Sequence, residues 1–212
     1  MSAWESPIIR VTTGQLNTVN DAVIGGEASI GGRSRYAGQL GKTLWVSPEQ
    51  IGTMFSSTVG TLYGGRFRYV RFRSGAGERA PLAPGLLVFW DTTLPSWQAL
   101  YQVTTNETLS SVDAAVMIAG VCISASTAGN YGFVQDVGMV PVRCRRTLTV
   151  AGAIGSRVYA AGAGAGADQA EADVLTDDAL SLANARYLGT AVTAPANGGL
   201  SPVMLGFKNI LG

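Results

Sequence analysis

The chain contains no histidine among its 212 residues, so it lacks the side chain that most often acts as a general base near neutral pH. This excludes serine–histidine and cysteine–histidine nucleophiles, and zinc or iron sites built on histidine. A serine–lysine pair would have to use Lys42 or Lys208, and neither lies near a distinctive serine motif. The 14 acidic residues could supply the two carboxylates of a glycosidase, but no spacing singles out a pair. The sequence therefore predicts no catalytic residues and a protein that is not an enzyme.

Three glycine-rich segments match nucleotide-binding patterns only in part. Gly41–Thr43 resembles the tail of a P-loop, but Tyr36 occupies the position of the first glycine. The loose dinucleotide pattern at 162–167 leads into a run of acids, which would repel a pyrophosphate. The similar pattern at 75–80 runs directly into Pro81, so no helix can open there. No cofactor is predicted.

Metal ligands and disulfides are not predicted either. The acidic run Asp168–Asp178 lacks the alternating ligands, the central glycine and the terminal glutamate of a calcium loop. Adventitious Ca²⁺ or Mg²⁺ binding is the alternative for this run. Cys122 and Cys144 belong to no CxxC pair and lie among apolar residues typical of strands, so we expect buried free thiols.

Arginines and aromatic residues alternate in the segment 66–73. Arg66 and Arg68 share one face of the expected strand with apolar residues, and Arg71 shares the other face with Tyr69. The strand must cross from an exposed edge into a buried site, or carry a bulge. Such a segment could stack on single-stranded nucleic acid, but its arginines fall on both faces and the net charge is only +1. Contacts to a protein partner are favoured. The predicted partner-binding residues are Arg33, Arg35, Arg66, Arg68, Tyr69, Arg71 and Phe72.

Charge is unevenly distributed along the chain. Eight basic and two acidic residues lie between Arg33 and Arg79, and five acids and no base lie between Asp168 and Asp178. Opposite patches of this kind would suit head-to-tail contacts between copies, with ordinary solvated faces as the alternative. The composition is 47% hydrophobic and only 14% charged, which favours burial of apolar surface by partner chains over one compact core.

The 28 glycines scattered between runs of Val, Thr, Ile and Tyr predict a mainly β fold with many turns. We expect a small β-barrel or β-sandwich over 61–212, preceded by an extended N-terminal arm over 1–60. Two short helices are expected, one beginning at the capping pattern of Ser47 and one near Asp178–Ala183. Gly162–Ala172 is expected to be a mobile loop. Beyond Phe67–Phe72, the expected strands are Gly85–Trp90, Ala115–Ser124, Gly132–Gln135, Met139–Arg143, Leu148–Val150, Arg157–Ala160, Tyr187–Ala194 and Ser201–Phe207.

The order of short motifs carries a resemblance. Ala119–Val121 is followed by Tyr131–Gln135 and a Val-rich strand after Gly138, then by Gly155–Tyr159. Tyr187–Ala191 comes next, and Gly198–Leu200 precedes the closing strand. Over about residues 80–207, this succession resembles the β-domains of head decoration, or capsid cement, proteins of tailed bacteriophages.

The resemblance implies a structural virion protein that binds the outer capsid surface and stabilises the shell by bridging neighbouring major-capsid subunits. Its implied partners are the major capsid protein and further copies of itself, as a homo-oligomer such as a trimer. The long segment 1–60 departs from compact members of the family. The alternative is a tail, baseplate or adhesin component of a phage particle. No secretion signal or membrane-spanning run is visible, so we expect assembly in the host cytoplasm, localisation on the virion, and no membrane or specific nucleic-acid partner.

Overall fold

A computed structural model describes residues 41, 43–47, 64–73, 77–78, 82–93, 101–106, 109, 111–112, 115–123, 129, 131–161, 170–174 and 187–206. These residues are mainly β, as predicted. The strands are β1 (Thr43–Val46), β2 (Gly65–Phe72), β3 (Leu87–Trp90), β4 (Gln102–Thr104), β5 (Ser111–Val112), β6 (Ala115–Val116), β7 (Ile118–Cys122), β8 (Tyr131–Arg143), β9 (Arg157–Ala160), β10 (Ala172–Val174), β11 (Tyr187–Ala191) and β12 (Leu200–Leu205). The described segments contain no helix long and apolar enough to span a membrane.

Ten strands join in one sheet in the order β1-β2-β4-β3-β7-β8-β12-β11-β9-β10, and β5 pairs with β6 separately. The β2–β4 pairing is parallel, and the other strand pairings are antiparallel. Since β2 also pairs with β8, five strands of the sheet pair in a ring: β2, β4, β3, β7 and β8. The sheet as a whole ends at β1 and β10 among the described strands and is not a closed barrel, so that alternative of the prediction is wrong.

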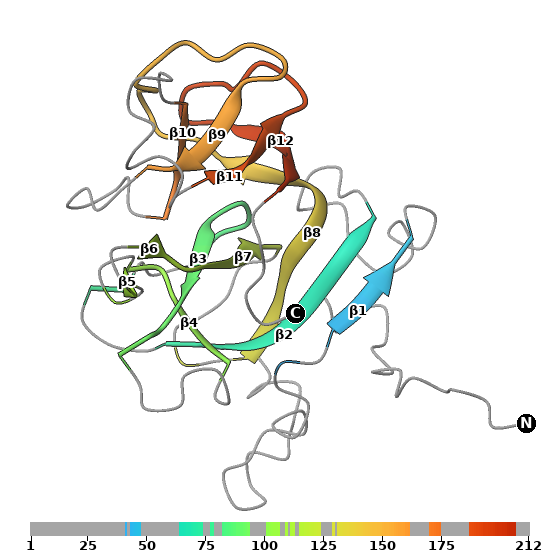
Figure 1. The fold of residues 1–212 in the computed structure, drawn as a ribbon, viewed down its shortest axis with the longest axis vertical. Coiled ribbons are helices and arrows are strands. Elements are labelled where there is room, and N and C mark those ends of the chain that lie inside the picture. The colour runs from blue at the N-terminus through green and yellow to red at the C-terminus, as the bar shows by residue number, and fades with distance from the viewer. Residues whose placement is uncertain are drawn as a thin grey trace, which may run out of the picture.

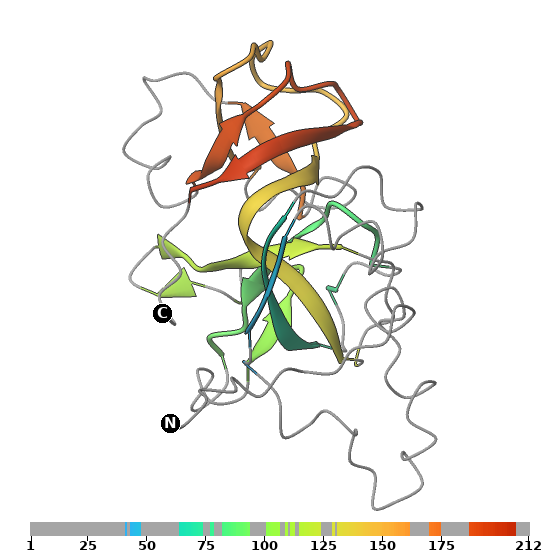
Figure 2. The same cartoon turned by 90° about the vertical axis from the view of Figure 1, so that its right-hand side faces the viewer.

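Strand β8 is 13 residues long and belongs to both parts of the sheet. Its first half pairs with β2 and β7, and its second half pairs with β12. Figure 1 shows β1 to β7 in the lower part of the molecule and β9 to β12 in the upper part, with β8 running between them. In Figure 2 the same strand curves strongly as it passes from one part to the other.

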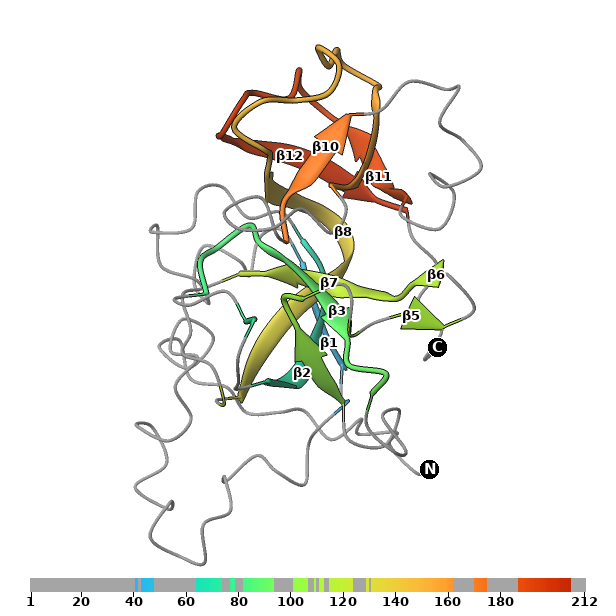
Figure 3. The same cartoon turned by 90° about the vertical axis from the view of Figure 1, so that its left-hand side faces the viewer.

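The centre of the lower part consists of strands without a polar face. Every residue of β3 and of β7 is buried, which is typical of strands covered on both sides. Figure 3 views these two strands from the side opposite to β1. Their side chains join those of β8 and β12 in one continuous hydrophobic core, in which Trp90 and Phe89 are the largest members from β3.

Several expected strands are confirmed. Arg157–Ala160 is β9 with the predicted bounds, while 85–90, 187–194 and 201–207 contain the shorter β3, β11 and most of β12. The two strands predicted at 132–135 and 139–143 are instead one strand, β8, because the residues between them form a bulge and not a turn.

The prediction of a strand at 148–150 is wrong. The backbone N–H of Leu148 donates to Asn197 Oδ1 at 3.1 Å, and that of Thr149 donates to Asp173 Oδ1 at 2.8 Å. Because side chains take these donors, the segment makes bends in place of a ladder.

Four short strands were not expected: β1, β4, β5 and β10. β1 lies inside the segment predicted as an extended arm and pairs along its whole length with β2. Most of that arm, both predicted helices apart from Ser47, and residues 162–169 of the predicted loop lie outside the described residues.

Candidate partner-binding surface

A bulge in β8 places one carboxylate against two arginines of β2. Arg66 is opposite Val137 and Phe67 is opposite Gln135, so Asp136 is the extra residue between them. Its side chain has no exposed surface. One carboxylate oxygen accepts from Arg66 Nε at 2.9 Å, and the other accepts from Arg66 Nη2 at 3.2 Å and from Arg68 Nε at 3.0 Å.

Two facing glycines allow the strands to approach closely at this bulge. Gly138 has a φ of +101°, and a Cβ there would lie 2.5 Å from the carbonyl oxygen of Gly64. A Cβ on Gly65, its partner on β2, would lie 2.2 Å from the carbonyl oxygen of Val137. Any larger residue would push the strands apart and separate Asp136 from the arginines.

The arginine pair lies beneath an exposed tryptophan on β1. Trp45 is opposite Arg66 in the β1–β2 ladder, and the Arg66 guanidinium carbon lies 6.0 Å from the ring centroid. Trp45 is 65% exposed, whereas the Arg66 side chain is 16% exposed. Thr43 is also exposed and shares this face of β1. Among the described strands β1 pairs with β2 alone, so the tryptophan stands on an edge strand.

This arrangement has the chemistry of a protein-binding surface. Tryptophan and arginine are the residue types most enriched where binding energy concentrates in interfaces. The carboxylate of Asp136 fixes the Arg66 guanidinium before a partner arrives, so little side-chain freedom remains to be lost on binding. We call Thr43, Trp45 and Arg66 the β1 surface.

The structure brings together only some of the predicted partner-binding residues. Arg66 belongs to the β1 surface, and Arg68 lies beneath it, 2% exposed, with its Nη1 3.3 Å from the carbonyl oxygen of Gly41. Arg71 is exposed on the opposite face of β2.

The two aromatic residues predicted to bind a partner lie in the hydrophobic core. Tyr69 and Phe72 are buried, and the Tyr69 ring lies 5.0 Å from that of Phe133. Arg33 and Arg35 lie outside the described residues. The prediction that this strand binds a partner stays a prediction. The sequence analysis missed Trp45, whose signal was the run of strand-favouring residues Thr-Leu-Trp-Val in β1.

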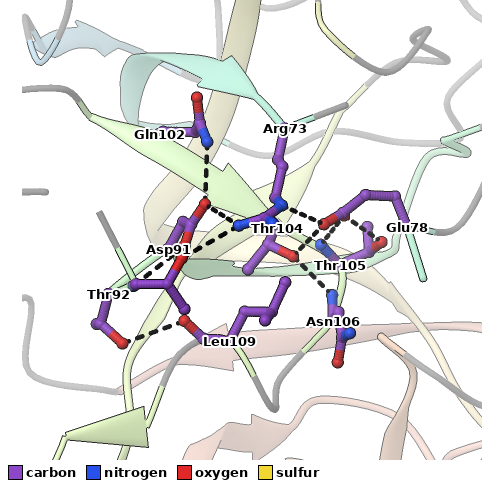
Figure 4. Close-up of polar contacts among 10 residues, drawn as sticks. Arg73, Glu78, Asp91, Thr92, Gln102, Thr104, Thr105, Asn106 and Leu109 are labelled. Carbon is purple, nitrogen blue, oxygen red and sulfur yellow. Dashed lines mark hydrogen bonds and ion pairs between the residues drawn. The ribbon is translucent and has the colours of Figure 1, made fainter. Parts of the chain in front are cut away.

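A second polar cluster lies at the ends of β2, β3 and β4. Figure 4 shows the Arg73 guanidinium between the carboxylates of Asp91 and Glu78. Arg73 Nη1 lies 2.6 Å from Asp91 Oδ2, and Arg73 Nε lies 3.6 Å from Glu78 Oε1. These two carboxylates would be the natural candidates for paired acid and base chemistry.

Their hydrogen bonds favour a structural role. Asp91 accepts from Thr93 Oγ1 at 2.6 Å and from Gln102 Nε2 at 2.9 Å, and its side chain is fully buried. Burial opposes ionisation, but the hydrogen bonds and the charge of Arg73 outweigh it, so the pKa of Asp91 lies below its ordinary value. A general acid would need the opposite shift.

Glu78 is held in a similar way. Thr104 Oγ1 donates to one of its oxygens at 2.6 Å, and Thr105 donates to the other from its backbone N–H at 2.8 Å and its hydroxyl at 2.9 Å. The cluster thus ties Glu78 and the end of β3 to β4.

The described part of the acidic run is internal. Asp173 lies on β10 with no exposed side-chain surface, 3.0 Å from Arg145 Nη1, and it accepts from the backbone N–H groups of Thr149 and Val174 at 2.8 Å. Glu171 is 5% exposed. The expectation of a surface acidic patch is therefore wrong for these two residues, because Asp173 is turned inward against Arg145 and Glu171 is buried as well. Within the described segments, no three His, Cys, Asp or Glu side chains gather as a metal site would require.

Both cysteines are free and buried, as predicted. Burial raises the pKa of Cys122 to about 12. Burial also raises the pKa of the Cys144 thiol, with help from the charges of Asp173 and Glu171. Neither thiol has the lowered pKa of a reactive nucleophile.

Neither a protein-family model, nor a curated protein, nor a solved structure matches this chain.

Proposed function

We propose that this chain is a non-catalytic structural protein that binds other proteins through the β1 surface. The observation that carries the proposal is Trp45, 65% exposed on an edge strand beside an arginine already fixed by a buried carboxylate. Burying the exposed part of a tryptophan in an interface would contribute about 3 to 4 kcal/mol before the entropy of association is subtracted.

A non-catalytic role is supported by how four of the five acidic residues in the described segments are used. Asp136, Asp91, Glu78 and Asp173 each neutralise an arginine and accept further hydrogen bonds or a second arginine. Carboxylates engaged in this way hold strands together.

The partner that we propose is the outer surface of a tailed-bacteriophage capsid. The order of motifs from Ala119 to Val203 resembles head decoration proteins, and the mainly β fold agrees with that resemblance. In this role each copy bridges neighbouring major-capsid subunits and adds contacts that exist only in the assembled shell, which stabilises the shell by mass action. Association with further copies of the chain and location on the virion belong to the same proposal.

The test is cosedimentation of the purified chain with heads of the encoding phage that lack it. Trp45→Ala should weaken binding by about tenfold or more, as truncation of a central interface tryptophan does. Ile154→Ala is the matched control, because Ile154 is 76% exposed but lies in the turn before β9.

Unchanged binding by Trp45→Ala would remove the β1 surface from the proposal. If the wild-type chain does not bind heads and instead sediments with purified tails, the tail, baseplate or adhesin alternative takes its place.

A further inference from the structure

Strand β12 has apolar residues on its solvent side as well as on its core side. Ser201 and Val203 point inward and are 1% and 0% exposed, as expected for the core side. The alternate residues point outward, and there Leu200 is 42% exposed and Met204 is 48% exposed, with Pro202 between them. A half-buried antiparallel strand ordinarily places polar residues on its solvent side.

The neighbouring strands continue this outward apolar face. Met204 is opposite Met139 of β8, and Pro202 is opposite Pro141. On the other side, Val192 donates its backbone N–H to the carbonyl oxygen of Pro202 and is 39% exposed. We call this surface the outer C-terminal face; its apolar members with accessible surface are Met139, Val192, Leu200, Pro202 and Met204, whereas Pro141 is buried.

One arginine lies at each edge of this face, on β8 and on β9. Arg143 of β8 is opposite Leu200, and its buried Nε makes no hydrogen bond to the part of the chain that the structure describes. Arg157 of β9 is exposed and is opposite Thr190, which in turn is opposite Met204. Because directly opposed residues of a sheet share a face, both guanidinium groups border the apolar centre.

Acidic residues do not balance these arginines on the described surface. Glu78, Asp91, Asp136, Glu171 and Asp173 are the acids in the described segments, and all have buried side chains. The charged residues exposed there are arginines: Arg71, Arg146 and Arg157. A second copy docked on the same face would therefore oppose arginine to arginine. A nucleic acid would meet an apolar centre in place of a basic track.

We propose that the outer C-terminal face binds a protein surface that presents apolar side chains surrounded by carboxylates. It is separate from the β1 surface, which lies in the other part of the molecule (Figure 1). The two proposals stand independently, and together they give the chain the two binding surfaces that a bridging protein needs.

The test uses methionine methyl NMR on the full chain. Met204 and Met139 report on the face, and Met117, which is 8% exposed in the core, is the internal control. The probes are a peptide of alternating leucine and glutamate, its leucine–lysine counterpart, and a single-stranded oligonucleotide. The acidic peptide should shift Met204 and Met139 but not Met117, and the basic peptide should bind at least about tenfold more weakly.

Two matched pairs of variants locate the charge and separate this proposal from the previous one. Arg157→Gln should weaken binding of the acidic peptide about threefold, whereas Arg71→Gln, which removes an exposed arginine from β2, should not. Met204→Glu should abolish binding, and Trp45→Ala should leave it unchanged.

Four results would overturn the inference. These are equal binding of both peptides, a stronger response to the oligonucleotide, shifts of Met204 that depend on protein concentration alone, and no response to any probe. The third would assign the face to contacts between copies. Each result leaves the head-binding test of Trp45 unaffected.

Discussion

Replacing Asp136 with asparagine should cause a large loss of stability, because one carboxylate neutralises two arginines. Its side chain has no exposed surface, and Arg68 beneath it is 3% exposed, so neither charge can recover its lost partner from water. Removing one member of a buried ion pair costs about 3 to 5 kcal/mol. Arg66 is 16% exposed and regains some hydration, so we expect about 3 to 4 kcal/mol for Asp136→Asn.

The control is Arg66→Gln, which leaves the pair between Arg68 and Asp136 intact. It should cost only about 1 kcal/mol, since the lost partner is partly exposed. The double variant Arg68→Met/Asp136→Leu removes both buried charges and should be less destabilising than Asp136→Asn alone. Urea unfolding followed by tryptophan fluorescence measures all three free energies of unfolding. The reasoning fails if Asp136→Asn lies within about 1 kcal/mol of the wild type, or if Arg66→Gln is equally destabilising.

Two further predictions concern a carboxylate and a pair of glycines. The pKa of Asp91 is lowered from 3.8, so its ionised form stabilises the fold above about pH 4, and this stabilisation is lost as the pH falls through the folded-state pKa. Asp91→Asn should therefore flatten the fall in unfolding free energy between about pH 5 and pH 2, and an unchanged slope would contradict this. Gly138→Ala should lower the free energy of unfolding by about 3 kcal/mol, because φ is +101° and the new Cβ would meet a carbonyl oxygen. The control is Gly155→Ala, where φ is +83° but no atom lies within 4 Å of the new Cβ. This control should lower the free energy of unfolding by only about 1 kcal/mol. Equal losses in urea unfolding would show that the close approach of the strands at Gly138 is unimportant.

Local patterns in the sequence were sufficient to predict a mainly β fold and several of its strands. Alternation and turn glycines identified β9 with its bounds, and the apolar surroundings of Cys122 identified a buried thiol. The mixed faces of Phe67–Phe72 correctly indicated an irregularity. The structure places the extra residue in the partner strand, at Asp136, which no pattern within β2 could show.

The polar contacts could not be predicted because they join distant positions. Arg66 and Asp136 are 70 residues apart, and Arg145 and Asp173 are 28 residues apart. From sequence alone each of these groups resembles a solvated surface charge. The pairing of β10 with β9 turns Asp173 inward against Arg145, and this pairing is visible only in the structure. Trp45 was missed for a related reason, since the short strand that carries it is defined by its pairing with β2.

The shared strand β8 also bears on how the molecule comes apart. Its first half completes the ring of β2, β4, β3 and β7, and its second half holds β12. Melting the upper strands would strip one end of β8 of its partners, and melting the lower strands would strip the other. Neither part can then unfold without weakening the other, so the two proposed binding surfaces belong to one cooperative unit. A force that a partner applies at one surface is therefore resisted by the hydrogen bonds of the whole ten-stranded sheet.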